Sequence, residues 1–284
     1  MWEGYEPFIG TEMVASGTLT RYELRKYYRA IMPNVYVPKR LEPSLRDRTL
    51  AAWLWSRREA VVAGVAASAL HGANWVDEKS PVELIWRNAR APRGVVTRDD
   101  LVLGSEFQML GGVHVTTPER TAFDLARRGP VGLAVARLDA LARATDIKVP
   151  DVEELAAGHR HARGLRQLES VLDLVDAGAQ SPKETWLRLL LIRAGFPRPQ
   201  TQIPVLSPDG LRTYYLDMGW EDINLAVEYD GDQHRTDPYQ FAYDIRRLDD
   251  VHELGWTLVR VVARHRSADV IRRVERARDA LTLR

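Results

Sequence analysis

The sequence predicts a mixed protein of the α/β (α+β) class, built from three successive regions. The chain has 284 residues, 45% hydrophobic and 28% charged, which is enough for more than one buried core. Helical and strand-like patterns alternate along it. Glycine, serine and proline gather in "VDAGAQSP" (175–182), as expected of a domain boundary. We therefore expect a helix-and-wing element at 1–45, an α/β domain at 46–178 and a third domain at 179–284.

Composition excludes several classes of protein. The 40 basic and 39 acidic residues give a net charge of +1, so any attraction to nucleic acid must come from local clusters. Cysteine is absent, which excludes disulfides, thiolate nucleophiles and cysteine-bound zinc. The N-terminal "MWEGYEPFIG" lacks a signal pattern, and "AVVAGVAASAL" is far shorter than the roughly 20 residues of a membrane span. We expect a cytoplasmic protein without a membrane partner.

The first region, residues 18–40, predicts a short helix that is opened by Thr20 and ends before Pro33, followed by the extended "NVYVPKR". This order is winged-helix-like. Its basic side chains could form one face that docks on DNA phosphates; they are Arg21, Arg25, Lys26, Arg29, Lys39 and Arg40. A solvated surface helix with no partner explains the same pattern.

The middle region predicts an α/β domain without a catalytic cluster. An alanine-rich helical stretch runs through "AAWLWSRREAVVAGVAASALHG", and "VELIWR" and "VHVTT" have the pattern of strands. Thr117 and Pro118 open a helix, and further helices are expected at 131–144, 151–157 and 164–176. His71 precedes a glycine, which favours a position at a helix C-terminus over a ligand role.

The last region predicts the order αβββαβ with a final helix. In "SPKETWLRLLLIRAGF", Ser181 is an N-cap and Glu184 completes a capping box, which is a sufficient structural reason for this glutamate. Three extended runs follow, "TQIPVL", "TYYLDMG" and "NLAVEY". A helix at 239–254, the strand "WTLVRVV" and a helix at 267–281 complete the region.

Acidic side chains converge on two of these strands. Alternation places Asp217 on the face opposite Leu216 and Met218, and places Glu228 and Asp230 on a common face of the next strand. Either a two-residue or a four-residue connection leaves the three acids on the same face. Like charges opposite one another destabilise a sheet.

A divalent cation bound between the three carboxylates would attract each of them and so outweigh this repulsion. An oxygen-rich site without cysteine favours Mg²⁺ (or Mn²⁺) over zinc. The alternative is that the acids merely solvate an open polar face. The sequence therefore predicts a magnesium site, with this alternative left open.

These residues resemble two known families. An acid on the first helix, Asp217 on the second strand and Glu228-Tyr229-Asp230 on the third resemble the PD-(D/E)XK nuclease superfamily. "VEYDGDQH" followed by "YDIRRLDDVHELGWTLVRV" is similar to the domain-of-unknown-function branch related to very-short-patch-repair endonucleases, over residues 181–284. "LRKYYRAIMPNVYVP", "ASALHG" and "VHVTTPERTAFDLARR" resemble AbiEi-type antitoxins of abortive-infection systems, which combine a winged helix-turn-helix with an α/β domain.

The nuclease resemblance implies roles for individual residues. Asp217 would be the central metal ligand, Glu228 the second and the Tyr229 carbonyl the third, with Glu184 as a peripheral acid. Asp230 stands where the superfamily usually has lysine, and we expect it to help hold the cation.

The lysine would position the attacking water and stabilise charge. Without it, His234 or a metal-bound hydroxide would have to take over this role. A loop histidine bonded to the backbone is the alternative for His234. Arg246 and Arg247 could contact phosphate or pair with Asp244.

The predicted function is that of a metal-dependent DNA endonuclease, docked on DNA by its N-terminal region. The alternative is an antitoxin-type DNA-binding transcriptional repressor whose nuclease fold is catalytically silent. A third interpretation is an interaction module paired with a toxin. The expected partners are therefore DNA and a cognate toxin protein.

Overall fold

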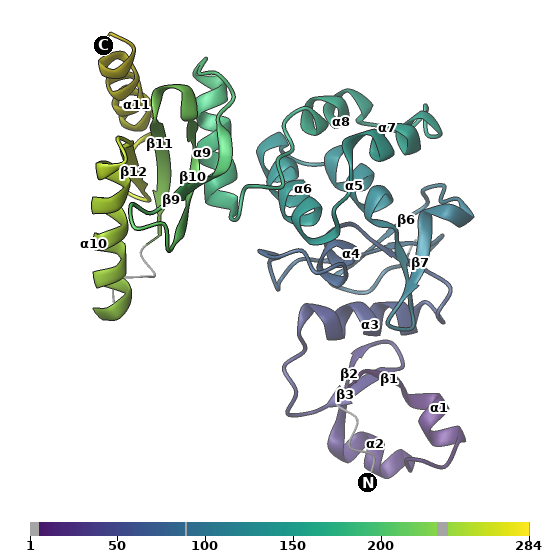
Figure 1. The fold of residues 1–284 in the computed structure, drawn as a ribbon. Helices are drawn as coiled ribbons and strands as arrows, with labels where there is room; N and C mark the ends of the chain where they lie inside the picture. The colour runs from purple at the N-terminus through teal and green to yellow at the C-terminus, as the bar shows by residue number, and fades with distance from the viewer. Residues whose placement is uncertain (1–5, 89, 232–237, 284) are drawn as a thin grey trace. The chain divides into compact units, whose positions relative to one another are not determined.

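A computed structural model of the protein describes residues 6–88, 90–231 and 238–283 (Figure 1). The chain divides into two compact units, Met1–Asp173 and Leu174–Arg284. Both units mix helices with strands, so the predicted α+β class is confirmed. Among the described residues, no helix has both the length and the apolar character that a membrane span requires.

Unit 1 begins with two short helices and a three-stranded sheet in the order β1-β3-β2. The elements are β1 (Phe8–Ile9), α1 (Gly10–Ala15), α2 (Arg21–Tyr27), β2 (Tyr28–Met32) and β3 (Val35–Pro38). Thr20 and Glu23 form the capping box that starts α2. The predicted helix is wrong beyond Tyr27, because the aromatic and β-branched residues that follow pair with β3 across a turn at Asn34 (φ 62°).

The rest of unit 1 surrounds a five-stranded sheet in the order β6-β5-β4-β8-β7. The elements are α3 (Leu45–Trp55), β4 (Val61–Ala63), α4 (Gly64–Leu70), β5 (Val82–Ile85), β6 (Val95–Arg98), η1 (Gly104–Glu106), β7 (Phe107–Leu110), β8 (Val113–Thr116), α5 (Pro118–Ala126), α6 (Val131–Thr145), α7 (Val149–Ala157) and α8 (Leu165–Leu172). His71 is the C-cap of α4, as predicted. The helices expected at 131–144, 151–157 and 164–176 are present, although the last is shorter.

The predicted alanine-rich helix is interrupted. Arg57 and Arg58 have positive φ angles of 61° and 67°, which end the helical path after α3. Residues 61–63 then form β4, a fully buried strand in the middle of the sheet. A strand that is buried on both faces has a continuous apolar sequence, which periodicity alone does not distinguish from a buried helix.

The N-terminal element shares a core with the larger sheet. Met32 and Val35 belong to the same hydrophobic cluster as α3, β4 and β5. Arg58 donates to both carboxylate oxygens of Glu12 on α1, each at 2.7 Å. The helix-and-wing element is therefore packed against the α/β part of unit 1.

A buried arginine joins three segments of unit 1. The Arg120 side chain is 1% exposed and donates from Nε to Asp124 (3.1 Å) and from Nη1 to Glu106 and to the Leu101 carbonyl (2.8 Å). His159 bonds the other Glu106 oxygen. Burial alone would raise the pKa of Glu106, but hydrogen bonds from His159 and the Leu103 N–H, together with the charge of Arg120, outweigh burial and lower it.

Unit 2 has a four-stranded sheet in the order β12-β11-β10-β9. The elements are α9 (Pro182–Arg193), β9 (Gln200–Leu206), β10 (Thr213–Trp220), η2 (Glu221–Ile223), β11 (Leu225–Asp230), α10 (Pro238–Glu253), β12 (Thr257–Val262) and α11 (Ser267–Thr282). This is the predicted αβββαβ order with a final helix. One buried cluster joins the sheet to α9 and α11, and another joins it to α10; Figure 1 shows α9 and α10 on opposite sides of the strands.

Strand alternation is broken at Asp217, so the predicted common face of Leu216 and Met218 is wrong. Leu216 belongs to the cluster on the α10 side, whereas Met218 belongs to the cluster with α9 and α11. Opposite Asp217, Gln202 of β9 has a φ of 52° and lies between two regularly paired residues. This local irregularity turns the apolar side chains of β10 from one face to the other.

The substitution Arg120→Met is expected to destabilise unit 1 by about 3–5 kcal/mol, because Glu106 and Asp124 stay buried after losing this cation. Urea unfolding at neutral pH, followed by circular dichroism, measures the loss. Arg87→Met is the control, because the ion pair of Arg87 with Asp99 is exposed and should contribute little. Equal unfolding midpoints for the two variants would contradict the role assigned to Arg120.

Candidate functional site

The predicted acids lie together in unit 2. Asp217 of β10 and Glu228 and Asp230 of β11 line one cavity of about 520 Å³. Arg247 of α10 and Arg260 of β12 line the same cavity. Asp244 of α10 lines it as well, so four carboxylates and two guanidinium groups share this space, which we call the acidic site.

The connection between β10 and β11 sets the position of Asp217. Trp220 pairs with Leu225, so the connection has four residues, which is the longer of the two predicted alternatives. The ladder continues to Met218 and Val227. Beyond this pair, the Tyr229 N–H donates to the Asp217 carboxylate at 2.9 Å. The Asp217 side chain thus takes the place of a backbone acceptor.

Arginines neutralise the two acids of β11. The buried Glu228 accepts hydrogen bonds on both carboxylate oxygens from the two Nη groups of Arg247, one of them at 3.2 Å. Arg247 also donates to the Tyr215 carbonyl at 2.9 Å, which fixes its orientation. Arg260 donates to Asp230 at 2.8 Å. The positive charge that compensates these carboxylates therefore comes from the chain itself.

Glu184 has the capping role that its position predicts. Its N–H donates to Ser181 Oγ at 3.2 Å, and its carboxylate accepts from the same hydroxyl at 2.9 Å. The other carboxylate oxygen accepts from the Gln180 N–H at 2.7 Å, one residue before the expected donor. Glu184 is buried, so its negative charge acts on neighbouring groups across little water.

Asp217 has a strongly perturbed acidity. Burial is the largest cause and, with the negative charges of Glu228 and Glu184, raises the pKa of Asp217 to about 7. The hydrogen bond from Tyr229 and the charge of Arg247 act in the opposite direction but are weaker. Near neutral pH, the protonated and the ionised form of the Asp217 carboxyl group are therefore both populated.

As they are arranged, these side chains do not fit a divalent cation. Among the described residues, no three histidine, aspartate or glutamate side chains are grouped closely enough to hold a metal ion. The oxygens of Glu228 are engaged by Arg247, and one oxygen of Asp230 by Arg260. The predicted base His234 lies outside the described residues. Binding of Mg²⁺ or Mn²⁺ stays a prediction.

The basic residues of the first region form an exposed surface on α2 and after β3. Its members are Arg21, Arg25, Lys26, Lys39 and Arg40. Lys39 donates to the Arg25 carbonyl at 2.7 Å, which ties the end of the wing to the helix. The Lys26 ammonium lies 5.3 Å and 5.1 Å from the ring centres of Tyr22 and Tyr27. We call this set the N-terminal basic surface.

Two of the arginines predicted to contact DNA, Arg29 and Arg247, bind groups of the protein. Arg29 lies on β2 and not on the predicted helix; it donates to the Leu41 carbonyl at 2.8 Å and lies 3.9 Å from Glu42. Arg247 is bound to Glu228, whereas Arg246 is exposed on α10. Arg29 and Arg247 therefore have structural partners within the chain.

A second cluster of arginines lies in unit 1, and no sequence pattern predicts it. Arg98, Arg127, Arg128 and Arg163 line a cavity in unit 1. The signal was present in "LARRGP" and "GHRHARG", two basic runs that flank helices. They lie more than 30 positions apart, so the sequence gives no reason to place them together.

Asp217→Asn is expected to stabilise unit 2 above neutral pH and to have little effect near pH 4. The folded pKa of about 7 lies above the ordinary 3.8, so ionisation costs stability progressively as the pH rises between these values. Asparagine cannot ionise, and the gain at pH 8 should be on the order of 2–4 kcal/mol. Urea unfolding across this pH range tests the expectation. Asp222→Asn, at an exposed position in η2, is the control. A gain for Asp217→Asn that is independent of pH would refute the assignment.

Comparisons with known proteins identify one domain and several similar chains. The model of the AbiEi antitoxin C-terminal domain matches residues 60–174, and this match ends one residue beyond the end of unit 1. Two relatives from Mycobacterium tuberculosis, the uncharacterized proteins MT2308 (strain CDC 1551 / Oshkosh) and Rv2248 (strain H37Rv), are each 29% identical over 221 residues, which is 78% of this chain and 81% of theirs. The crystal structure of the RV2827C protein from the same species aligns with 72% of this chain and 85% of its own at a TM-score of 0.39 and 17% identity. Residues 60–174 thus carry an AbiEi antitoxin C-terminal domain.

Proposed function

We propose that the protein is an antitoxin-type DNA-binding transcriptional repressor. The observation that carries the proposal is an AbiEi antitoxin domain at residues 60–174, preceded in the same unit by a basic helix-and-wing element. A cognate toxin protein is the second expected partner, because an antitoxin acts on a toxin. This interpretation is favoured here over the nuclease that the C-terminal motifs suggested.

The N-terminal basic surface is the proposed docking site for DNA. Arg21, Arg25 and Lys26 project from a short capped helix, and Lys39 and Arg40 follow the wing, so one element offers cations to both strands of a groove. The chain as a whole is nearly neutral, at +1. Attraction to phosphates therefore depends on this local clustering and should fall steeply with salt.

A metal-dependent endonuclease is the second candidate. The convergence of Asp217, Glu228 and Asp230 in one cavity on an αβββαβ framework favours it. The bonds that Arg247 and Arg260 make to those acids argue against it, since they occupy the oxygens that a cation would need. Under the repressor proposal, these ion pairs stabilise unit 2, and the acidic site is part of a nuclease fold that has no catalytic activity.

The double substitution Arg21→Ala with Arg25→Ala is expected to weaken binding to duplex DNA about tenfold or more. The log–log slope of affinity against salt should fall by about 2, because two phosphate contacts are lost. Fluorescence anisotropy with a labelled duplex from upstream of the gene measures both quantities. Arg143→Ala with Arg193→Ala removes the same charge from exposed positions elsewhere and should leave both unchanged. Equal losses in the two double variants would contradict the docking site.

The repressor proposal also predicts that the protein does not cut DNA. Supercoiled plasmid incubated with Mg²⁺ or Mn²⁺ should remain intact, and neither ion should raise the melting temperature of the wild type more than that of Asp217→Asn. Cleavage by the wild type that Asp217→Asn abolishes would establish the nuclease in place of a silent fold.

A further inference from the structure

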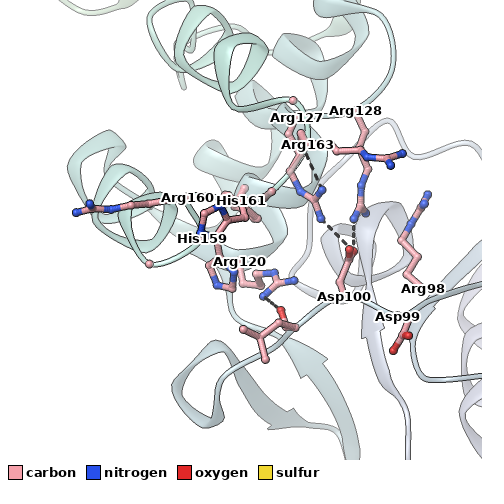
Figure 2. A pocket seen from close by; sticks show the side chains of 15 residues that line it. Arg98, Asp99, Asp100, Arg120, Arg127, Arg128, His159, Arg160, His161 and Arg163 are labelled. Atoms are coloured by element: carbon pink, nitrogen blue, oxygen red, sulfur yellow. Dashed lines mark hydrogen bonds and ion pairs between the residues drawn. The ribbon is translucent and has the colours of Figure 1, made fainter.

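An arginine-lined cavity lies in unit 1, apart from the N-terminal basic surface. It has a volume of about 760 Å³ and is bounded by residues 98–101 at and after the end of β6, by α5 and the two arginines that follow it, and by the loop 158–164 between α7 and α8. Figure 2 shows the side chains of Arg98, Arg127 and Arg128 gathered around Asp100, with Arg160 directed away from them. This size is that of an ordinary small-ligand site.

Carboxylate groups of the protein bind several of the arginine side chains that line the cavity. Asp100 accepts from Nη2 of Arg127 at 3.0 Å and also from Nη2 of Arg128. Asp124, which is fully buried, accepts from Nη2 of Arg127 at 2.8 Å. Arg98 donates Nε to Glu83 at 2.5 Å. These bonds orient the guanidinium groups and leave part of their hydrogen-bonding capacity for a ligand, since each has five N–H donors.

The cations of this cluster repel one another. Burial, followed by the positive charges of Arg127 and Arg98, lowers the pKa of Arg128, although Asp124 and Asp100 act in the opposite direction. Asp100 titrates lower than usual: burial opposes the shift, but the charges of Arg128 and Arg127 outweigh it. Further negative charge inside the cavity would therefore be stabilised.

The loop 158–164 adds polar side chains with fewer partners to the cavity. Within the described residues, the side chains of His161 and Arg163 have no acidic partner, and both are exposed. Gly164 fixes this loop, because a Cβ at this position would lie 2.2 Å from the Arg127 carbonyl oxygen. Arg127 in turn donates to the Arg163 carbonyl at 3.5 Å. The loop is thus held close to the arginines that follow α5.

We propose that this cavity binds the phosphate group of a small-molecule ligand. Arg98, Arg128 and Arg163 come from three different segments, and a tetrahedral phosphate can accept hydrogen bonds from all three directions at once. A carboxylate has two oxygens whose acceptor directions lie in one plane, so it offers acceptors in fewer directions than a phosphate does. The site is independent of the proposed repressor function, since it needs neither DNA nor a toxin.

Calorimetry with inorganic pyrophosphate at low salt tests the proposal on the full-length protein. We expect saturable binding to the wild type and at least tenfold weaker binding to Arg163→Glu, because the charge that faces the phosphate is reversed. Arg166→Glu makes the same change three residues later, at an exposed position outside the cavity, and should bind as the wild type does. Circular dichroism establishes that both variants are folded.

Two further probes identify the source of the phosphate. Tighter binding of adenosine diphosphate than of pyrophosphate would point to a nucleotide, and the reverse would point to a free phosphate compound. Three results would overturn the proposal: no binding of pyrophosphate at millimolar concentration, equal affinity of wild type and Arg163→Glu, or binding of adenosine or glutarate as tightly as pyrophosphate.

Discussion

Arginine compensation of buried carboxylates is the constraint on which both units depend. A carboxylate removed from water needs a cation or several hydrogen bonds, and a chain without cysteine and with few lysines meets this need with arginine. Arg120 joins α5 to η1 in unit 1, and Arg247 joins α10 to β11 in unit 2. In both cases the ion pair links segments distant in sequence, so it contributes to the tertiary arrangement as well as to local charge balance.

This constraint also explains the crowding of acids in "LAVEYDGD". Glu228 and Asp230 would repel each other and Asp217 in an uncompensated sheet, but each β11 acid has an arginine partner. Among the described residues, no arginine forms an ion pair with Asp217, and its pKa is raised. The repulsion is thus relieved by two guanidinium groups and by partial protonation of Asp217.

The two units suggest different relations between charge and function. In the first unit, the exposed cations of the N-terminal basic surface make no ion pair with a carboxylate among the residues that the structure describes, which suits contact with a polyanion. In the second unit, the cations of the acidic site are already used by the protein. The AbiEi domain lies in the same unit as the first kind of surface, which favours the proposed DNA binding over phosphodiester hydrolysis.

The sequence by itself determined the α+β class, the order αβββαβ and most helix starts, because caps such as Thr20 and Ser181 and strand alternation act over a few residues. It did not determine that residues 61–63 form a central strand or that β10 changes face at Asp217, because burial on both sides of a sheet and the irregularity at Gln202 depend on neighbouring strands. Only the tertiary structure decided which charges meet. Arg247 and Glu228 are 19 positions apart, and Arg98 and Arg163 are farther still, so their proximity follows from packing and not from any local pattern.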